Sequence, residues 1–163
     1  MRVGLFIPCY VDQFYPQVGI ATLELLEKFG CEVVYPSSQT CCGQPMANSG
    51  FEHLTKGCND LFIKNFEEFD YIVSPSGSCV LHIKDHLNGE DGTETTIPKK
   101  IYEFVEFMTD VLQVGALEAS FPFKAGYPSE LPRPAGIEAG ADERADGGAI
   151  LQAGAAVEDG EGH

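Results

Sequence analysis

Near its N-terminus the chain reads Val3-Gly4-Leu5-Phe6-Ile7-Pro8-Cys9, a short apolar run that leads into a proline and a cysteine. Such a run is typical of a strand buried on both faces of a parallel sheet. It is too short for a signal peptide and has no small-residue cleavage site. We therefore expect a first strand over residues 3–7 and a cytoplasmic protein.

The same kind of segment recurs along the first 124 residues. Apolar runs predict further strands at 32–35 and 71–74, and helical spacing of apolar residues predicts helices at 16–29, 51–69, 79–86 and 98–112. This alternation predicts an α/β domain over residues 1–124, with a parallel sheet flanked by helices in three layers.

Residues 125–163 have a different composition. Ala, Gly, Asp and Glu dominate, with 8 acidic and 2 basic side chains and a single aromatic residue, Tyr127. So little apolar surface cannot offset the entropy lost on ordering the chain. We expect an acidic tail that is disordered or weakly structured.

The charge of the chain excludes several classes of partner. The net charge is −15 and the sequence pI is near 4.4, whereas a nucleic-acid-binding protein needs a basic face to replace phosphate counterions. An anionic membrane surface is disfavoured for the same reason. No apolar run approaches the roughly 20 residues of a membrane-spanning helix, so we expect neither nucleic-acid binding nor membrane insertion.

Four of the six cysteines follow predicted strands. Cys9 comes after the first strand, Cys41 and Cys42 after the second, and Cys79 after the third. Loops at the carboxyl ends of parallel strands meet at one edge of the sheet and form its binding site. Since the cytosol also disfavours a disulfide framework, we expect these four thiols to converge as ligands.

The remaining cysteines are expected to be structural. Cys31 enters the second strand from its opposite end, and Cys58 lies in the apolar stripe of a predicted helix. Free cysteine is among the most buried residue types.

Four thiolates are soft ligands that suit zinc, Cu(I) or an iron–sulfur cluster. Structural zinc sites usually contain Cys-x2–4-Cys pairs, and this chain has an adjacent Cys41-Cys42 pair in their place. Two thiols that point apart suit a multi-iron cluster better than a single ion. Two alternatives remain open: a metal-free thiol redox protein and a zinc-binding structural module.

Three segments carry a family resemblance: residues 3–12, Gln39-Thr40-Cys41-Cys42-Gly43-Gln44-Pro45, and Pro75-Ser76-Gly77-Ser78-Cys79-Val80. They resemble the cysteine-rich "CCG" domain that occurs in heterodisulfide reductases and in glycolate oxidase iron–sulfur proteins. Their residue sequences are most similar to those of the lactate-utilization protein A group of that family.

The resemblance implies a specific function. It implies a 4Fe-4S cluster bound by Cys9, Cys41, Cys42 and Cys79. The chain would then be an electron-transfer subunit of a cytosolic oxidoreductase complex that oxidises L-lactate to pyruvate. Its implied partners are the other iron–sulfur subunits of a lactate-utilization complex and a small 2-hydroxy acid substrate.

The chain departs from the family pattern at two places. Ser76 stands where the broader domain has the first cysteine of Cys-x-x-Cys, which leaves four thiols, the number that fits one 4Fe-4S cluster. The resemblance also ends near residue 124, where members of the family usually begin a second cysteine-rich repeat. We therefore expect a truncated or frameshifted copy whose enzymatic activity is in question.

Other polar residues near the cysteines have less specific roles. Ser76 and Ser78 are either hydrogen-bond donors to cluster sulfurs or ordinary turn residues. His82 and His86 have the i, i+4 spacing of a metal-binding pair, but without further ligands we expect these two and His53 to face solvent or to cap helices.

Overall fold

The computed structural model describes residues 1–87, 95–115, 125–127 and 149–151. The chain divides into two compact units, Met1–Gln113 and Val114–His163. The expected domain boundary after residue 124 lies outside the described residues, as does most of the expected disordered tail. In the described parts of that tail, two strands pair antiparallel: β5 (Ala125–Tyr127) and β6 (Ala149–Leu151).

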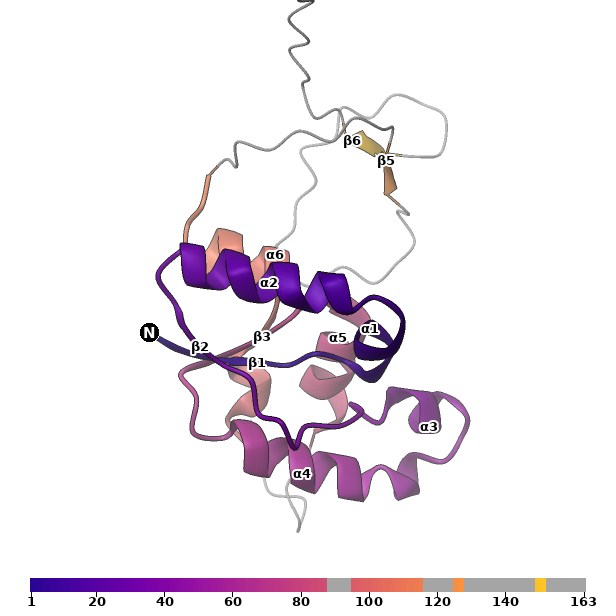
Figure 1. Cartoon of the computed structure of the whole chain (residues 1–163). Coiled ribbons are helices and arrows are strands. Elements are labelled where there is room, and N and C mark those ends of the chain that lie inside the picture. Colours follow the sequence, from indigo (N-terminus) through magenta and orange to yellow (C-terminus); the bar gives the residue numbers. More distant parts are fainter. Residues whose placement is uncertain (88–94, 116–124, 128–148, 152–163) are drawn as a thin grey trace, which may run out of the picture. The chain divides into compact units, whose positions relative to one another are not determined.

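The first unit is built on a parallel sheet of four strands in the order β2-β1-β3-β4 (Figure 1). The strands are β1 (Arg2–Leu5), β2 (Glu32–Val34), β3 (Tyr71–Ser74) and β4 (Ile101–Glu103). Val3 of the central strand pairs with Val33 on one side and with Tyr71 on the other. The predicted parallel α/β sheet is confirmed.

Helices cover both faces of this sheet, so the predicted three layers are confirmed. One face carries α1 (Cys9–Phe14), α2 (Pro16–Lys28) and the pair formed by α6 (Phe104–Glu106) and the π-helical turn η3 (Phe107–Val111). The other carries α4 (Lys56–Phe66) and α5 (Gly77–His86). Within residues 1–87 and 95–115, no helix combines the length and the apolar character needed to cross a membrane.

An aromatic core lies between the sheet and α4. The rings of Phe6 and Phe62 meet edge to face with centroids 4.9 Å apart, and Phe66 and Phe69 extend the cluster. Gly4 leaves room for these rings, because a Cβ atom there would lie 2.7 Å from a ring carbon of Phe69 and 2.9 Å from one of Phe66. The apolar face of α4 therefore packs directly against the backbone of β1.

The predicted helix over residues 98–112 is wrong in its first half. Ile101–Glu103 forms the edge strand β4 beside β3, after a short turn, η2 (Ile97–Lys99). The helix begins only at Phe104, where the Glu103 carboxylate accepts hydrogen bonds from the amides of Val105 and Glu106. Ile101 fits a helical stripe, but the free edge of β3 favours the strand because it satisfies backbone groups that would otherwise lack partners.

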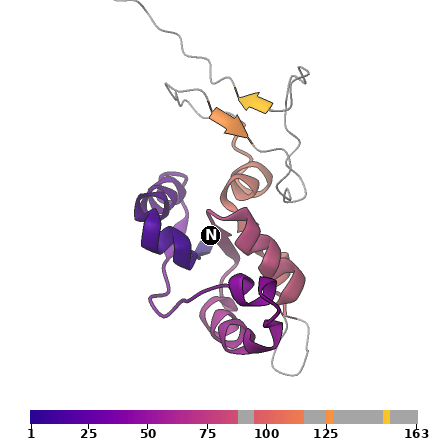
Figure 2. The same cartoon turned by 90° about the vertical axis from the view of Figure 1, so that its right-hand side faces the viewer.

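The predicted helix over residues 51–69 is shorter than expected, because it is preceded by the separate turn η1 (Glu52–Leu54). Two short helices were not predicted: α1, which begins at Cys9, and α3 (Gln44–Asn48), which follows Gly43. Figure 2 shows the molecule from the side toward which β1 runs, and α1, α3 and α5 lie on this side. Cys9 begins α1, Cys41 and Cys42 lie just before α3, and Cys79 lies in α5.

Candidate metal centre

The carboxyl edge of the sheet brings the predicted cysteines together. Cys9 is the first residue of α1 after β1, Cys41 and Cys42 lie between β2 and α3, and Cys79 lies in the first turn of α5 after β3. The four thiols meet as two pairs. The predicted convergence of three strand-end loops is therefore present in the fold.

The outer pair is Cys9 and Cys41. Their Sγ atoms are 3.7 Å apart, and the backbone amide of Gly43 donates a hydrogen bond to the Cys41 sulfur at 3.4 Å. Partial burial, the hydrogen bond to Cys41 and the nearby charges of Cys41 and Cys79 raise the pKa of the Cys9 thiol. Cys9 is exposed, so this pair is the accessible half of the centre.

The inner pair is Cys42 and Cys79, which are both buried in the core against α4 and α5. The Cys42 thiol donates a hydrogen bond to Cys79 and lowers the pKa of Cys79 to about 7, with burial opposing the shift and the hydroxyls of Ser76 and Ser78 adding to it. The same hydrogen bond and burial raise the pKa of Cys42. The contact between Cys42 and Cys79 thus favours ionisation of Cys79 over that of Cys42.

Ser76 links the first and third loops. It is buried, and its Oγ accepts a hydrogen bond of 3.2 Å from the hydroxyl of Tyr10, which follows Cys9 in α1. A hydrogen bond from Ser76 also lowers the pKa of Cys79, and donation from Ser76 to cluster sulfurs stays a prediction.

Gly43 allows the second loop to turn into α3. Its φ is +90°, a left-handed conformation that strains residues with a side chain. A Cβ atom at this position would lie 3.2 Å from the Thr55 side chain and 3.6 Å from Nε2 of His82. The Cys-Cys-Gly sequence therefore needs its glycine for backbone conformation and for space.

The expected exposure of the histidines is wrong for His82. His82 is only 6% exposed, and its ring lies 4.9 Å from that of His86. Burial, followed by the charge of His86, lowers the pKa of His82, and Glu52 and Asp85 oppose this shift. His86 is half exposed and lies 3.3 Å from a Glu52 oxygen, and His53 faces solvent.

The two cysteines expected to be structural lie outside the pairs. Cys31 is buried in the core on the α2 face of the sheet. Cys58 is half-buried on α4, and its pKa is raised by burial and then by the charge of Cys41. Cys58 is thus close enough to Cys41 to be affected by its charge, which its place in a helical stripe did not predict.

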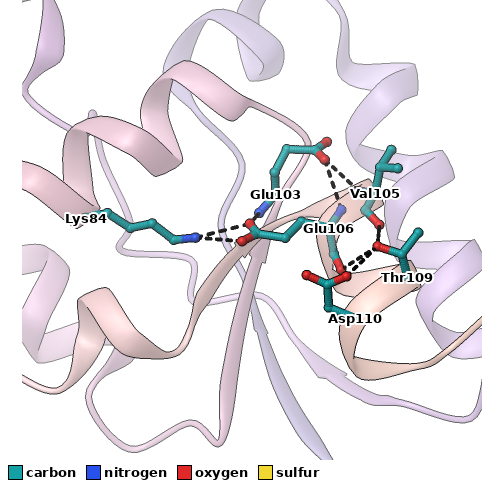
Figure 3. Close-up of polar contacts among 6 residues, drawn as sticks. All are labelled: Lys84, Glu103, Val105, Glu106, Thr109 and Asp110. Carbon is teal, nitrogen blue, oxygen red and sulfur yellow. Dashed lines mark hydrogen bonds and ion pairs between the residues drawn. The ribbon is translucent and has the colours of Figure 1, made fainter. Parts of the chain in front are cut away.

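The helix that carries Cys79 is anchored by an ion pair. Lys84 of α5 contacts both carboxylate oxygens of Glu106, at 2.9 and 3.1 Å, and Glu106 is nearly fully buried. Glu106 also accepts a hydrogen bond from the backbone amide of Glu103 at the end of β4 (Figure 3). This network joins α5 to the β4–α6 junction.

The donor set fits an iron–sulfur cluster in kind, since four soft thiols come from three loops with backbone and hydroxyl donors beside them. Their spacing is that of thiols in mutual contact. Among the described residues, no three or more His, Cys, Asp or Glu side chains are placed as ligands of one metal ion. A cluster that spreads its ligands over several irons would have to separate the Cys9 and Cys41 sulfurs from their 3.7 Å contact.

Comparison with known proteins gives a family match. Residues 3–84 match the family described as CCG, cysteine-rich domain. No solved structure matches the chain.

Several curated relatives share the name lactate utilization protein A. One from an Exiguobacterium species is 45% identical over 148 residues, which cover 85% of this chain and 60% of the relative. Those from Halalkalibacterium halodurans and Geobacillus thermodenitrificans are 44% and 41% identical over 133 residues, or 78% of this chain and 54% and 56% of the relatives. The chain thus matches between half and three fifths of the length of these relatives.

Proposed function

This chain belongs to the cysteine-rich CCG domain family, and on that premise we propose that it binds a 4Fe-4S cluster as an electron-transfer subunit in lactate utilization. The proposed ligands are Cys9, Cys41, Cys42 and Cys79. The observation that carries the proposal is the meeting of these four thiols from three separate loops at one sheet edge.

Two of the proposed ligands, Cys41 and Cys79, have hydrogen-bond donors beside them that suit a bound thiolate. The Gly43 amide already donates to the Cys41 sulfur, and the hydroxyls of Ser76 and Ser78 stabilise negative charge on Cys79. Such donors to sulfur, together with burial, set the reduction potential of a cluster. Ser76 then acts as a donor beside the ligands, which is consistent with four ligands and not five.

The proposed reaction is the oxidation of L-lactate to pyruvate by a complex of iron–sulfur subunits. Oxidation of a 2-hydroxy acid to a 2-keto acid releases two electrons and two protons. A bound 4Fe-4S cluster would supply this chain with a one-electron carrier. Other subunits must therefore share the electrons, and the exposed Cys9 side of the centre is where electrons would pass to them. The name of the relatives supports this setting, and we place the protein in the cytoplasm.

Anaerobic purification tests the proposal. Iron, acid-labile sulfide and zinc would be measured per chain, and reduced protein would be examined by electron paramagnetic resonance. We expect roughly four iron and four sulfide per chain, with the resonance of a reduced cluster. Colourless protein that contains one zinc and no sulfide would instead identify a zinc-binding structural module.

A second candidate function follows from the contact between Cys9 and Cys41. Two thiols 3.7 Å apart, near a Cys79 thiol with a pKa of about 7, also suit a metal-free thiol redox protein. Purified protein that contains neither iron nor zinc, and that exchanges reversibly with a glutathione redox buffer, would favour this function over the first.

A further inference from the structure

The side-chain amide of Gln39 makes three hydrogen bonds at the edge of the sheet. Its Oε1 accepts from the backbone amide of Ile7 at 2.8 Å. Its Nε2 donates to the carbonyls of Leu5 and Pro36, both at 3.1 Å. This one amide therefore connects the end of β1 with the loop that follows β2.

These contacts continue the parallel pairing where the backbone of β2 can no longer do so. The pairing of β1 with β2 ends at Gly4 and Val34, and Pro36, two residues later, has no N–H to donate. On the other side of β1, the Phe6 amide still bonds to Val73 of β3. On the β2 side of Phe6, the side chain of Gln39 takes the place of a strand residue. A residue of a parallel strand paired with Phe6 would bond the carbonyl of Leu5 and the amide of Ile7, and Gln39 bonds these same two groups.

The position of Gln39 relates it to the outer pair of thiols. Ile7, which donates to it, lies two residues before Cys9, and Gln39 itself lies two residues before Cys41. The chain segments that carry these two cysteines are thus joined immediately upstream of both sulfurs. The sulfurs lie 3.7 Å apart although 31 residues separate them in the chain.

We infer that Gln39 is a positioning residue that holds the Cys9 loop against the Cys41 loop and so sets the spacing of the outer pair. The inference rests on the proposed function where it concerns a bound cluster. For the cluster-free protein it concerns only the two thiols, so it can be tested whether or not a cluster binds.

Two substitutions separate the contacts of Gln39. Gln39→Met keeps the length of the side chain and removes all three hydrogen bonds. Gln39→Glu keeps an oxygen for the Ile7 amide and removes both donors. Gln17→Met is the matched control, since Gln17 is an exposed glutamine on α2.

The first readout is disulfide formation in cluster-free protein treated with oxidised glutathione. Each disulfide formed transfers two electrons to one oxidised glutathione and releases two molecules of glutathione. Peptide mapping by mass spectrometry would measure the Cys9–Cys41 disulfide relative to the Cys42–Cys79 disulfide in the same sample. Because the inner pair is an internal reference, a general loosening of the fold, which frees both pairs, is distinguished from loss of positioning.

We expect the rate ratio of the outer to the inner disulfide to fall about tenfold in Gln39→Met, since small misplacements of reacting groups cost large factors in rate. The rate ratio in Gln39→Glu should lie between those in Gln39→Met and the wild type, and the ratio in Gln17→Met should equal that of the wild type. An unchanged ratio in Gln39→Glu would overturn the inference, even if Gln39→Met failed to fold.

The second readout is the electron paramagnetic resonance spectrum of reconstituted protein. We expect Gln39→Glu to change the line shape while the iron content per chain stays near that of the wild type. If the wild type binds no cluster, the proposed function fails, and the disulfide ratio still decides the role of Gln39. A wild-type line shape in a loaded Gln39→Glu variant would count against the inference.

Discussion

The Sγ atom of Cys9 lies 3.7 Å from the Sγ atom of Cys41, although the two residues belong to loops that follow different strands. Their contact depends on the strand order, because β1 and β2 are neighbours in the sheet and run in the same direction. The inner pair depends likewise on β3, which lies on the other side of β1 and brings Cys79 to the same edge. The topology of the sheet thus assembles the centre.

Replacement of each cysteine by alanine tests the proposed ligand set. We expect Cys9→Ala, Cys41→Ala, Cys42→Ala and Cys79→Ala each to lose most of the bound iron, because each removes one ligand. Cys31→Ala is the control, since Cys31 lies in the core on the opposite face of the sheet. Iron and sulfide analysis after anaerobic reconstitution is the measurement. Loss of iron in the control alone would contradict the assignment.

The low pKa of Cys79 should depend on its neighbour. In cluster-free protein we expect Cys42→Ala to raise the pKa of Cys79 above its value of about 7, because the variant lacks the thiol that donates to the thiolate. Ser76→Ala should shift it in the same direction by less. The pH dependence of Cys79 alkylation, followed by mass spectrometry, measures this pKa. Cys31→Ala should leave it in place, and a Cys79 pKa that is unchanged in Cys42→Ala would disprove the donor role.

Gly4 should tolerate no side chain. Gly4→Ala places a methyl group within 2.7 Å of the Phe69 ring, and we expect the free energy of unfolding to fall by about 1–3 kcal/mol. Gly57 on α4 is the matched control, since nothing lies within 4 Å of a Cβ atom there. Gly57→Ala should leave stability unchanged or raise it by up to about 1 kcal/mol. Urea unfolding of both variants compares them, and an equal effect would refute the packing argument.

The ion pair between Lys84 and Glu106 should contribute to stability through burial. Lys84→Met leaves the Glu106 carboxylate buried without its cation, and we expect a loss of about 1–3 kcal/mol. This is below the usual cost of breaking a buried pair, because the Lys84 side chain is 27% exposed. Lys64→Met, an exposed change on α4, should have little effect.

A double variant distinguishes the burial of a charge from the loss of packing. Lys84→Met combined with Glu106→Gln removes the unpaired charge and should recover part of the stability lost in Lys84→Met. Denaturant unfolding at neutral pH measures all three proteins. This account would be contradicted if the double variant were less stable than Lys84→Met, as expected for two independent destabilising substitutions.

His82 should make the protein sensitive to acid. Burial keeps its folded-state pKa below the ordinary value of 6.5, so on acidification the unfolded chain takes up a proton before the folded chain does. The contribution of neutral, buried His82 to the free energy of unfolding is therefore fully present above pH 6.5, and it is lost as the pH decreases below that value. His82→Gln should flatten this part of the stability curve, whereas the exposed change His53→Gln should not. Thermal unfolding between neutral and mildly acidic pH is the measurement. Equal slopes of stability against pH in the His82→Gln and His53→Gln variants would contradict the argument.

The sequence predicts the three strands that precede the cysteines well, because the signals of these strands are local. The run Val3–Ile7 is apolar without helical spacing, and Tyr71–Ser74 matches the observed strand at both ends. Each predicted strand is followed by residues that end strands, such as Pro8 and Pro75. From these positions alone, Cys9, Cys41, Cys42 and Cys79 could be assigned to one edge of a parallel sheet.

The fourth strand could not be predicted in this way. Ile101, Phe104 and Met108 have helical spacing, and the strand forms only because β3 offers an unpaired edge. The burial of His82 and the three contacts of Gln39 were missed for a similar reason. Both depend on neighbours distant in the chain, Gly43 for His82 and the end of β1 for Gln39.

The sequence by itself therefore determined the class of fold, the strands that precede the cysteines and the edge at which the cysteines meet, because strand signals and turn residues act over a few positions. Only the tertiary structure decided that Cys9 pairs with Cys41 and Cys42 with Cys79, and in which direction the contact between Cys42 and Cys79 shifts their pKa values. Those outcomes depend on distance, burial and hydrogen bonding between segments that come together only when the chain has folded.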